Sequence, residues 1–299
     1  MTIDDIQCIG VVGTGQMGCG IANVVAMSGW DVLLLDVSSA IVKVALERIK
    51  ADLERAVTKG ILHPGHVAPC VARLHPIGRI EELAEAQFVI EATPEDSELK
   101  TDLFRQMGVC CKPETILASN TSSISITLLG KAAERPDCVV GIHFMNPAPV
   151  MRLVEIVRGL ETSQETVARA TGLVMRMGKT PVICIDTPGF IVNRLLIPMI
   201  NEAICLLQER QGESDSERTP EAIDLAMTAG ANHPQGPLAL ADRIGLDTVL
   251  AICEVLHHDL GDSKFSPNPL LRKYVEAGWL GRKSGRGFYV YPPRLAIGI

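Results

Sequence analysis

The chain has 299 residues, 47% of them hydrophobic and 21% charged, so it can bury the core of one large domain or two medium domains. Its formal net charge of −7 argues against nucleic acid as the main partner, and no apolar stretch approaches the ~18 residues that a membrane span needs. The nine cysteines follow no disulfide or metal spacing, and the N-terminus lacks the basic start of a secretory signal. We therefore expect reduced thiols and a cytoplasmic protein.

Short buried strands alternate with helices over the first part of the chain. Strands are predicted at 7–12, 32–36, 88–92, 115–119, 139–143 and 182–185. Helices are predicted at 16–29, 38–59, 97–108, 124–133 and 163–177. This alternation is typical of an α/β domain with a mostly parallel sheet that helices cover on both faces. The segment 152–157 alternates polar and apolar residues more regularly, so it is expected to pair differently in that sheet.

The pattern changes at D-T-P-G, residues 186–189. Beyond it the chain is mainly helical, with helices predicted at 190–209, 220–229, 238–258 and 268–277. The stretch 210–219 is polar and aperiodic, which predicts an exposed loop between helices. We expect a doubly wound α/β domain over residues 1–186 and an all-α domain over residues 187–299.

A glycine-rich segment, G-T-G-Q-M-G, occupies residues 13–18 between the first predicted strand and the first predicted helix. In such a loop Gly13 permits the tight turn, Gly15 lets a pyrophosphate approach the backbone, and Gly18 lets the helix pack close to the strand. Free N–H groups and the helix dipole can then bind phosphates, and we count Gln16 and Met17 with this loop. The alternative is a helix N-terminus that only tolerates glycines. Strand, glycines and helix in register favour a Rossmann-type dinucleotide-binding unit.

Asp36 follows the second predicted strand, where a carboxylate can accept hydrogen bonds from the adenosine ribose. The same carboxylate repels a 2′-phosphate, and the first cation after it is Lys43. The sequence therefore favours NAD over NADP as the cofactor.

His143 and Glu155 bracket the segment H-F-M-N-P-A-P-V-M-R-L-V-E. This segment places one imidazole and one carboxylate on two successive elements that could bring them together. Such a pair can move a proton near neutral pH. The alternative for His143 is a hydrogen-bonded histidine at a strand end with no role in chemistry.

Further motifs accompany these two along nearly the whole chain. They are S-N-T-S-S at 119–123, H-F-M-N-P at 143–147, D-T-P-G-F-I-V-N-R at 186–194, G-P-L-A-L-A-D-R-I-G-L-D at 236–247 and G-R-K-S-G-R-G-F-Y at 281–289. With this set in this order, the chain resembles the 3-hydroxyacyl-CoA dehydrogenases, and most of all their stand-alone short-chain type.

The resemblance implies an N-terminal Rossmann domain, a C-terminal helical domain that carries a homodimer interface, and reversible NAD-dependent oxidation of a 3-hydroxyacyl-CoA to a 3-ketoacyl-CoA. By motif match it implies that His143 is the catalytic base and Glu155 its partner, with Ser122 and Asn193 near the reacting oxygen. The cofactor contacts implied in the same way are Asp36, Glu95, Lys100, Asn146 and Lys283. Lys59 matches a residue that contacts coenzyme A, and a serine with that role in some relatives is replaced here by Asp52.

Several of these residues have structural alternatives. Ser122 could cap the helix that starts near residue 124, and Asn193 could make a hydrogen bond in helix packing. Glu95 and Lys100 could be an acid at a helix start and a solvated lysine, and Lys283 could be exposed in its glycine-rich segment. The charges of helix 38–59, apart from Lys59, fit a solvated face of mixed sign.

The function expected from the sequence is therefore that of an NAD-dependent dehydrogenase acting on a short-chain acyl-CoA. One alternative is a dehydrogenase of another 3-hydroxy compound, either a free acid or a carrier-bound acyl group. Another is a non-enzymatic relative that has kept the fold, as some crystallins have. Acyl chain length, pathway and direction do not follow from the sequence.

Overall fold

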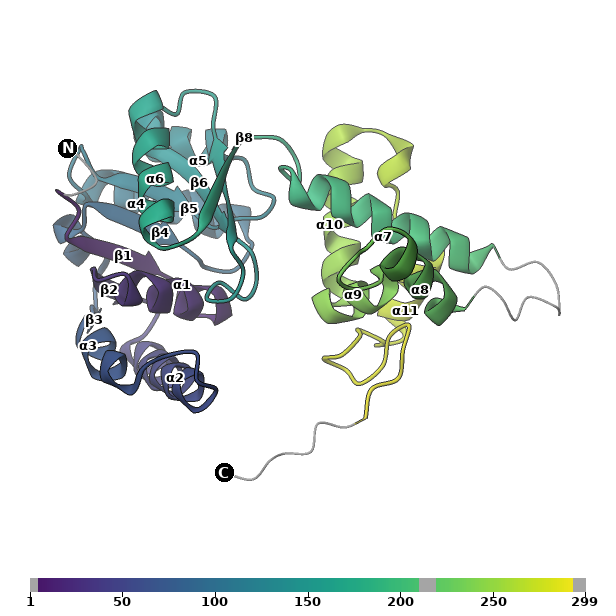
Figure 1. The fold of residues 1–299 in the computed structure, drawn as a ribbon. Helices are drawn as coiled ribbons and strands as arrows, with labels where there is room; N and C mark the ends of the chain where they lie inside the picture. Colours follow the sequence, from purple (N-terminus) through teal and green to yellow (C-terminus); the bar gives the residue numbers. More distant parts are fainter. Residues whose placement is uncertain (1–4, 210–218, 293–299) are drawn as a thin grey trace. The chain divides into compact units, whose positions relative to one another are not determined.

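The structure is a computed structural model that describes residues 5–209 and 219–292. The chain divides into two compact units, Met1–Phe190 and Ile191–Ile299 (Figure 1). Each unit has its own hydrophobic core. Residues 210–218, which hold nearly all of the predicted loop, lie outside the described residues.

The first unit is built on an eight-stranded sheet with the order β3-β2-β1-β4-β5-β6-β7-β8. Its strands are β1 (Cys8–Val12), β2 (Asp31–Leu35), β3 (Leu74–Pro76), β4 (Phe88–Glu91), β5 (Ile116–Ser119), β6 (Val139–Phe144), β7 (Leu153–Arg158) and β8 (Thr180–Ile185). Every neighbouring pair is parallel except β6 and β7, which are antiparallel. The predicted doubly wound sheet is confirmed, and so is the different pairing of the segment 152–157.

Helices cover both faces of this sheet. They are α1 (Gln16–Met27), α2 (Ser39–Thr58), α3 (Val67–Ala72), α4 (Ser97–Cys110), α5 (Ile126–Ala132) and α6 (Gln164–Arg176), with short 3-10 helices η2 (Pro64–His66), η3 (Ile80–Glu85) and η4 (Pro136–Cys138). Side-chain caps explain where several helices begin, since Ser38, Asp96 and Ser163 each accept a hydrogen bond from a backbone N–H of the first turn. β3 and α3 were not predicted, because with three and six residues they are too short to show a clear period.

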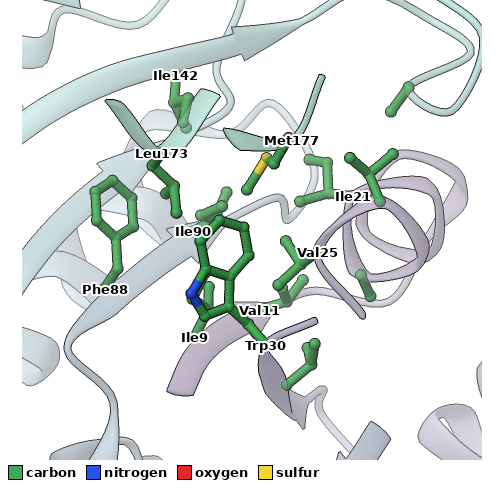
Figure 2. Packing of buried hydrophobic residues seen from close by; sticks show 14 of the residues in the cluster. Ile9, Val11, Ile21, Val25, Trp30, Phe88, Ile90, Ile142, Leu173 and Met177 are labelled. Atoms are coloured by element: carbon green, nitrogen blue, oxygen red, sulfur yellow. The ribbon is translucent and has the colours of Figure 1, made fainter. Parts of the chain in front are cut away.

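Two hydrophobic clusters lie on opposite faces of the sheet. One contains residues of α1, α2 and α6, and the other contains residues of α4 and α5. Figure 2 shows the first cluster, in which Trp30 lies among aliphatic side chains from β1, β4, α1 and α6. The indole Nε1 of Trp30 donates a hydrogen bond to the carbonyl oxygen of Ile6 at 3.0 Å, which satisfies the one polar atom of this buried ring.

The strand order reverses between β1 and β4, because β2 and β3 follow on one side of β1 while β4 to β8 follow on the other. In open α/β sheets, ligands bind beyond the carboxyl ends of the strands at such a reversal. The glycine loop follows β1, Asp36 follows β2, and Glu91 ends β4. These residues therefore lie at the edge of the sheet where a dinucleotide is expected.

The second unit is helical. Its helices are α7 (Val192–Gln208), α8 (Pro220–Gly230), α9 (Pro237–Ile244), α10 (Leu246–Leu260) and α11 (Pro269–Glu276), with the 3-10 helix η5 (Ser263–Phe265). The all-α prediction is confirmed, but the single helix predicted over 238–258 is wrong. Gly245 separates α9 from α10 with a φ of 108°, a conformation that glycine tolerates and that ends the helix.

A buried carboxylate on α9 binds the segment after α11 through hydrogen bonds. Asp242 accepts hydrogen bonds from the backbone N–H groups of Phe288 and Tyr289 and from the hydroxyl of Tyr291, at 2.9–3.0 Å. Burial raises the pKa of Asp242, and these hydrogen bonds oppose that rise. The C-terminal glycine-rich motif is thus part of the folded second unit.

Across the described ranges, none of the helices combines the length and hydrophobicity that a bilayer crossing requires. All nine cysteines fall within residues that the structure describes, and all nine are free thiols.

Candidate active site

The glycine loop has the geometry that phosphate binding requires. Gly13 has a φ of 90°, and a Cβ at this position would collide with the backbone of Ala92. A Cβ at Gly18 would overlap the carbonyl oxygen of Gly13, so close packing of α1 on the loop requires glycine there. A Cβ at Gly15 would meet no other part of the described chain within 4 Å, so the space above this residue is open. No side chain caps the N-terminus of α1, and its backbone N–H groups are available to an anion.

Asp36 is bound to this loop through its carboxylate. Its Oδ2 accepts hydrogen bonds from the backbone N–H and the hydroxyl of Thr14, at 2.6 and 2.7 Å. Its Oδ1 accepts from the N–H of Val37 at 2.7 Å, and the side chain is half-buried. The carboxylate is therefore held in one position beside the glycine loop. That position suits recognition of a ribose diol and disfavours a phosphate.

His143 and Glu155 are brought together by the antiparallel pairing of β6 and β7, in which the two residues are direct partners. Nδ1 of His143 lies 2.7 Å from Oε2 of Glu155. Glu155 is fully buried, and the His143 side chain is 10% exposed. Because an ionised carboxylate only accepts hydrogen bonds, the proton sits on Nδ1, and Nε2 is the ring nitrogen that can take another.

Two residues that the sequence analysis did not single out border this pair. The ring of Phe190 meets the imidazole of His143 edge to face, with centroids 5.5 Å apart. Phe190 has a φ of 48°, which is unusual for an aromatic residue. Burial raises the pKa of the Cys184 thiol to about 12, and the nearby Glu155 carboxylate adds to the rise, so this cysteine stays protonated. The motif D-T-P-G-F was the signal that could have pointed to Phe190.

The S-N-T-S-S turn after β5 is held by a single carboxylate oxygen. Oε1 of Glu95 accepts hydrogen bonds from the hydroxyl of Thr121 and from the N–H and hydroxyl groups of both Ser122 and Ser123, at 2.6–3.1 Å. Burial alone would raise the pKa of Glu95, but these donors and the Lys100 ammonium together lower it below its ordinary value. The capping alternative for Ser122 is wrong, because Ser125 caps α5 by accepting from Leu128 N.

The same turn is tied to the neighbouring strand. Oδ1 of Asn120 accepts a hydrogen bond from the N–H of Phe144 at 2.9 Å. Since β5 and β6 are parallel neighbours, Ser122 and His143 lie at the carboxyl ends of adjacent strands. The structure thus places a hydroxyl and an imidazole at one edge of the sheet.

Lys100 is buried. Its side chain is 1% exposed, and its Nζ donates to Oε1 of Glu91 at 2.6 Å and to the carbonyl oxygen of Thr93 at 3.1 Å. Oε2 of Glu95 lies 3.6 Å from the same ammonium. The alternative of a solvated lysine is wrong. Glu91, which the sequence analysis did not single out, is its principal partner.

Comparisons with known proteins identify the family of the chain. The profile described as "3-hydroxyacyl-CoA dehydrogenase, NAD binding domain" matches residues 8–187, and "3-hydroxyacyl-CoA dehydrogenase, C-terminal domain" matches residues 189–291. The chain belongs to the 3-hydroxyacyl-CoA dehydrogenase family. Its first unit therefore carries an NAD-binding domain of that family.

Three relatives illustrate the similarity. A protein of Bacillus subtilis named probable 3-hydroxybutyryl-CoA dehydrogenase is 51% identical over 96% of this chain and 98% of its own length. The crystal structure of (S)-3-hydroxybutyryl-CoA dehydrogenase from Ralstonia eutropha is 44% identical, with a TM-score of 0.91 over 96% of this chain and all of that one. A 3-hydroxyadipyl-CoA dehydrogenase of Escherichia coli is 43% identical over 95% of this chain and 59% of its own length.

The remaining predicted site residues of this dehydrogenase lie as follows. Gln16 Nε2 donates to Oδ1 of Asn146 at 3.1 Å, which joins the glycine loop to the segment after β6. Met17 is half-buried and packs against the core of the first unit. Lys59 is exposed at the end of α2, where Asp52 forms an ion pair with Arg55.

Two predicted residues lie in the second unit. Asn193 is half-buried in the first turn of α7. Lys283 is half-exposed, and its Nζ donates to Oδ2 of Asp247 at 2.5 Å. The cofactor and substrate roles of all these residues stay predictions.

Replacing Gly15 with alanine is expected to weaken NADH binding at least about tenfold and to leave the melting temperature unchanged. Apart from Gly15, its chain neighbours and the adjacent helix backbone, no atom of the described residues lies within 4 Å of the added Cβ, so the substitution fills only the space that a pyrophosphate needs. Calorimetric titration with NADH measures the effect. Gly230→Ala, where a Cβ also meets nothing within 4 Å, is the matched control in the second unit. Unchanged affinity in Gly15→Ala would show that the pyrophosphate does not lie over this loop.

Proposed function

We propose that the protein catalyses the reversible NAD-dependent oxidation of an (S)-3-hydroxyacyl-CoA to the 3-ketoacyl-CoA. The observation that carries the proposal is the contact between His143 and Glu155 at the sheet edge that also holds the glycine loop. Membership of the 3-hydroxyacyl-CoA dehydrogenase family supports the same reaction. The residues present also fit the cofactor, since open space over Gly15 and the fixed carboxylate of Asp36 are the features that NAD needs.

Under this proposal, Nε2 of His143 accepts the proton of the substrate's 3-hydroxyl group. NAD, when bound, supplies the acceptor for the hydride that leaves the carbon bearing this hydroxyl group. Glu155 fixes the imidazole tautomer through Nδ1 and stabilises the positive charge that His143 gains. Because Glu155 is fully buried, that stabilisation acts in a medium of low dielectric constant and is stronger than it would be in water.

Ser122 and Asn193 are proposed to donate hydrogen bonds to the reacting oxygen. The hydroxyl of Ser122 donates to Oε1 of Glu95 at 3.1 Å, the longest of the five contacts that this oxygen accepts. Its backbone N–H donates to the same oxygen at 2.8 Å and fixes the position of the residue. The hydroxyl can therefore turn toward a substrate oxygen while the backbone stays in place.

The substrate is proposed to be a short-chain acyl-CoA such as 3-hydroxybutyryl-CoA, with Lys59 at the coenzyme A end. The names of the Bacillus subtilis and Ralstonia eutropha relatives favour this chain length. The Escherichia coli relative, named for a 3-hydroxyadipyl substrate, makes a longer acyl chain with a terminal carboxylate the second candidate.

The function is tested by measuring NADH consumption with acetoacetyl-CoA and with free acetoacetate. Oxidation of NADH by acetoacetyl-CoA alone is the expected result. Equal rates with free acetoacetate would favour a dehydrogenase of free 3-hydroxy acids, and no consumption with either would favour a non-enzymatic relative. Comparing kcat/KM for acyl-CoAs of increasing length, 3-oxoadipyl-CoA included, then measures the chain-length preference.

Use of NADPH in place of NADH is expected to lower kcat/KM about 100-fold, because Asp36 would face a 2′-phosphate of like charge. The carboxylate is held by Thr14 and Val37 and has little freedom to move aside. Steady-state kinetics with both cofactors measure the ratio of kcat/KM with NADH to kcat/KM with NADPH. Asp36→Ser should reduce this ratio at least about tenfold. Equal use of NADPH by the unmodified protein would overturn the assignment of Asp36.

The roles of the two domains, the oligomeric state and the cellular location are also proposed. We assign cofactor binding to residues 1–186 and substrate binding and dimerisation to the helical residues 187–299. A homodimer is expected, which light scattering coupled to size-exclusion chromatography would test. A cytoplasmic location is supported by nine free thiols and no disulfide among the described residues.

A further inference from the structure

Glu91 is the buried centre of a hydrogen-bond network beside the glycine loop. It is 0% exposed at the end of β4. Its Oε1 accepts from Nζ of Lys100 at 2.6 Å and from the N–H and hydroxyl of Thr93 at 2.6 and 2.7 Å. Its Oε2 accepts from the hydroxyl of Ser119 at 2.6 Å. Four donors therefore meet one carboxylate, and none of its oxygens faces solvent.

This network joins the two loops that follow β4 and β5. The Ser119 hydroxyl that donates to Glu91 also accepts a hydrogen bond from the N–H of Thr121 at 3.1 Å. Thr121 in turn donates through its hydroxyl to Glu95 at 2.6 Å. Hydrogen bonds to Glu91 thus fix the start of the turn that contains Ser122, and hydrogen bonds to Glu95 fix its end.

The position of the network relates it to one half of the cofactor. Glu91 pairs with Val12, the last residue of β1, across the reversal of strand order. Asp36 lies on the β2 side of that reversal, where the adenosine ribose is expected. A dinucleotide that crosses the reversal places its second half, the nicotinamide nucleoside, on the β4 and β5 side. The network lies on that side.

The network carries a net negative charge. Glu91 and Glu95 contribute two carboxylates, and Lys100 contributes one ammonium, which leaves a net charge of one negative unit. Both members of the Glu91–Lys100 ion pair are at most 1% exposed, so solvent screens their field poorly. Asp96 and Glu98, which lie nearby in sequence, are exposed and are screened by water and salt.

We infer that Glu91 is a positioning residue of the nicotinamide half-site, and that its buried charge shifts the relative affinity of the site toward the oxidised cofactor. The nicotinamide ring is cationic in NAD⁺ and neutral in NADH, so a negative network stabilises the first form selectively. Glu91 also fixes Lys100 and the turn that holds Ser122. This inference rests on the NAD-binding domain and on the cofactor placement of the proposed function, but not on the identity of the substrate.

The test is calorimetric titration of the full-length protein with NAD⁺ and with NADH. Glu91→Gln keeps the shape of the side chain and removes one negative charge from the network. The ratio of Kd for NAD⁺ to Kd for NADH should rise about threefold to fifteenfold, as expected for a unit charge acting over roughly 10 Å at an effective dielectric constant of about 20–50. A ratio equal to that of the unmodified protein would overturn the inference.

Matched variants separate charge from structure. Glu98→Gln removes an exposed carboxylate from the first turn of α4 and should leave the ratio unchanged. Ser119→Ala removes one hydrogen bond to Glu91 without changing charge, and should weaken both cofactor forms equally. In Glu91→Gln/Lys100→Met the net charge returns to one negative unit, so the ratio should return to its original value even where both affinities fall. If Glu91 had a purely structural role, the Kd ratio of this double variant would deviate further from that of the unmodified protein than the ratio of Glu91→Gln does.

If Glu91→Gln does not fold, Glu95→Gln makes the same change in network charge at a side chain that is 37% exposed. The ratio of Kd for NAD⁺ to Kd for NADH should rise in this variant too, and an unchanged ratio would overturn the inference. These measurements do not depend on catalysis. A protein that binds both cofactor forms but does not reduce acetoacetyl-CoA would contradict the proposed substrate and leave this inference intact.

Discussion

Replacing His143 with glutamine is expected to lower kcat for acetoacetyl-CoA reduction by about 10²–10⁴-fold, the usual contribution of a positioned acid or base. Glutamine can still donate to Glu155, so the buried carboxylate keeps a partner, but it cannot take or give the proton at the reacting oxygen. The affinity for NADH should stay within about twofold, because the glycine loop and Asp36 are unchanged.

The control is His75→Gln, a histidine of the same unit whose side chain is 48% exposed and pairs with Asp31. This variant should turn over acetoacetyl-CoA at the rate of the unmodified protein. If His143→Gln kept more than about one tenth of the original kcat, the assignment of His143 as the acid and base would be wrong. Loss of NADH binding would instead indicate a structural role for the histidine.

The parts of the fold and site that could be predicted are those with local signals. Gly13, Gly15 and Gly18 lie at fixed spacing between a strand and a helix, and each has the local geometry expected for its role. His143 and Glu155 were predicted to meet because they lie on successive elements, and the antiparallel register of β6 and β7 makes them direct partners. Backbone conformation and strand pairing explain both results.

Lys100 shows why other features could not be predicted. In the segment S-E-L-K it has the polar neighbours of a solvated lysine, yet its side chain is 1% exposed. Its burial depends on Glu91, which is nine residues earlier on a strand, and on how α4 packs over the end of β4. A weaker signal was present in F-V-I-E-A, since a carboxylate in a buried strand needs a partner.

Gly245 illustrates a second limit of local patterns. The run 238–258 keeps apolar residues at helical spacing, and an isolated glycine within such a run is often tolerated. The helix ends there because Gly245 adopts a φ of 108°, and the segment after α11 then packs against this bend through Lys283 and Asp247. That packing involves residues 36 positions apart, so no local pattern reveals it.

Replacing Lys100 with methionine is expected to lower the free energy of unfolding of the first unit by about 3–5 kcal/mol. The substitution removes the ammonium but leaves the carboxylate of Glu91 fully buried without its ionic partner. Urea unfolding can follow the first unit alone if Trp279 is first replaced with phenylalanine, because the chain has two tryptophans and the other, Trp30, is 3% exposed in the first unit's core. The fluorescence of Trp30 then reports the transition.

Two further variants decide whether the lost stability comes from the unpaired carboxylate. Lys131→Met changes an exposed lysine of α5 and should shift the free energy of unfolding by less than about 0.5 kcal/mol. Glu91→Gln/Lys100→Met removes both charges of the buried pair and should recover most of the stability, because a neutral glutamine beside methionine carries a smaller desolvation cost than an unpaired carboxylate. If the double variant were as unstable as Lys100→Met, the loss would come from packing of the lysine side chain and not from the unpaired charge of Glu91.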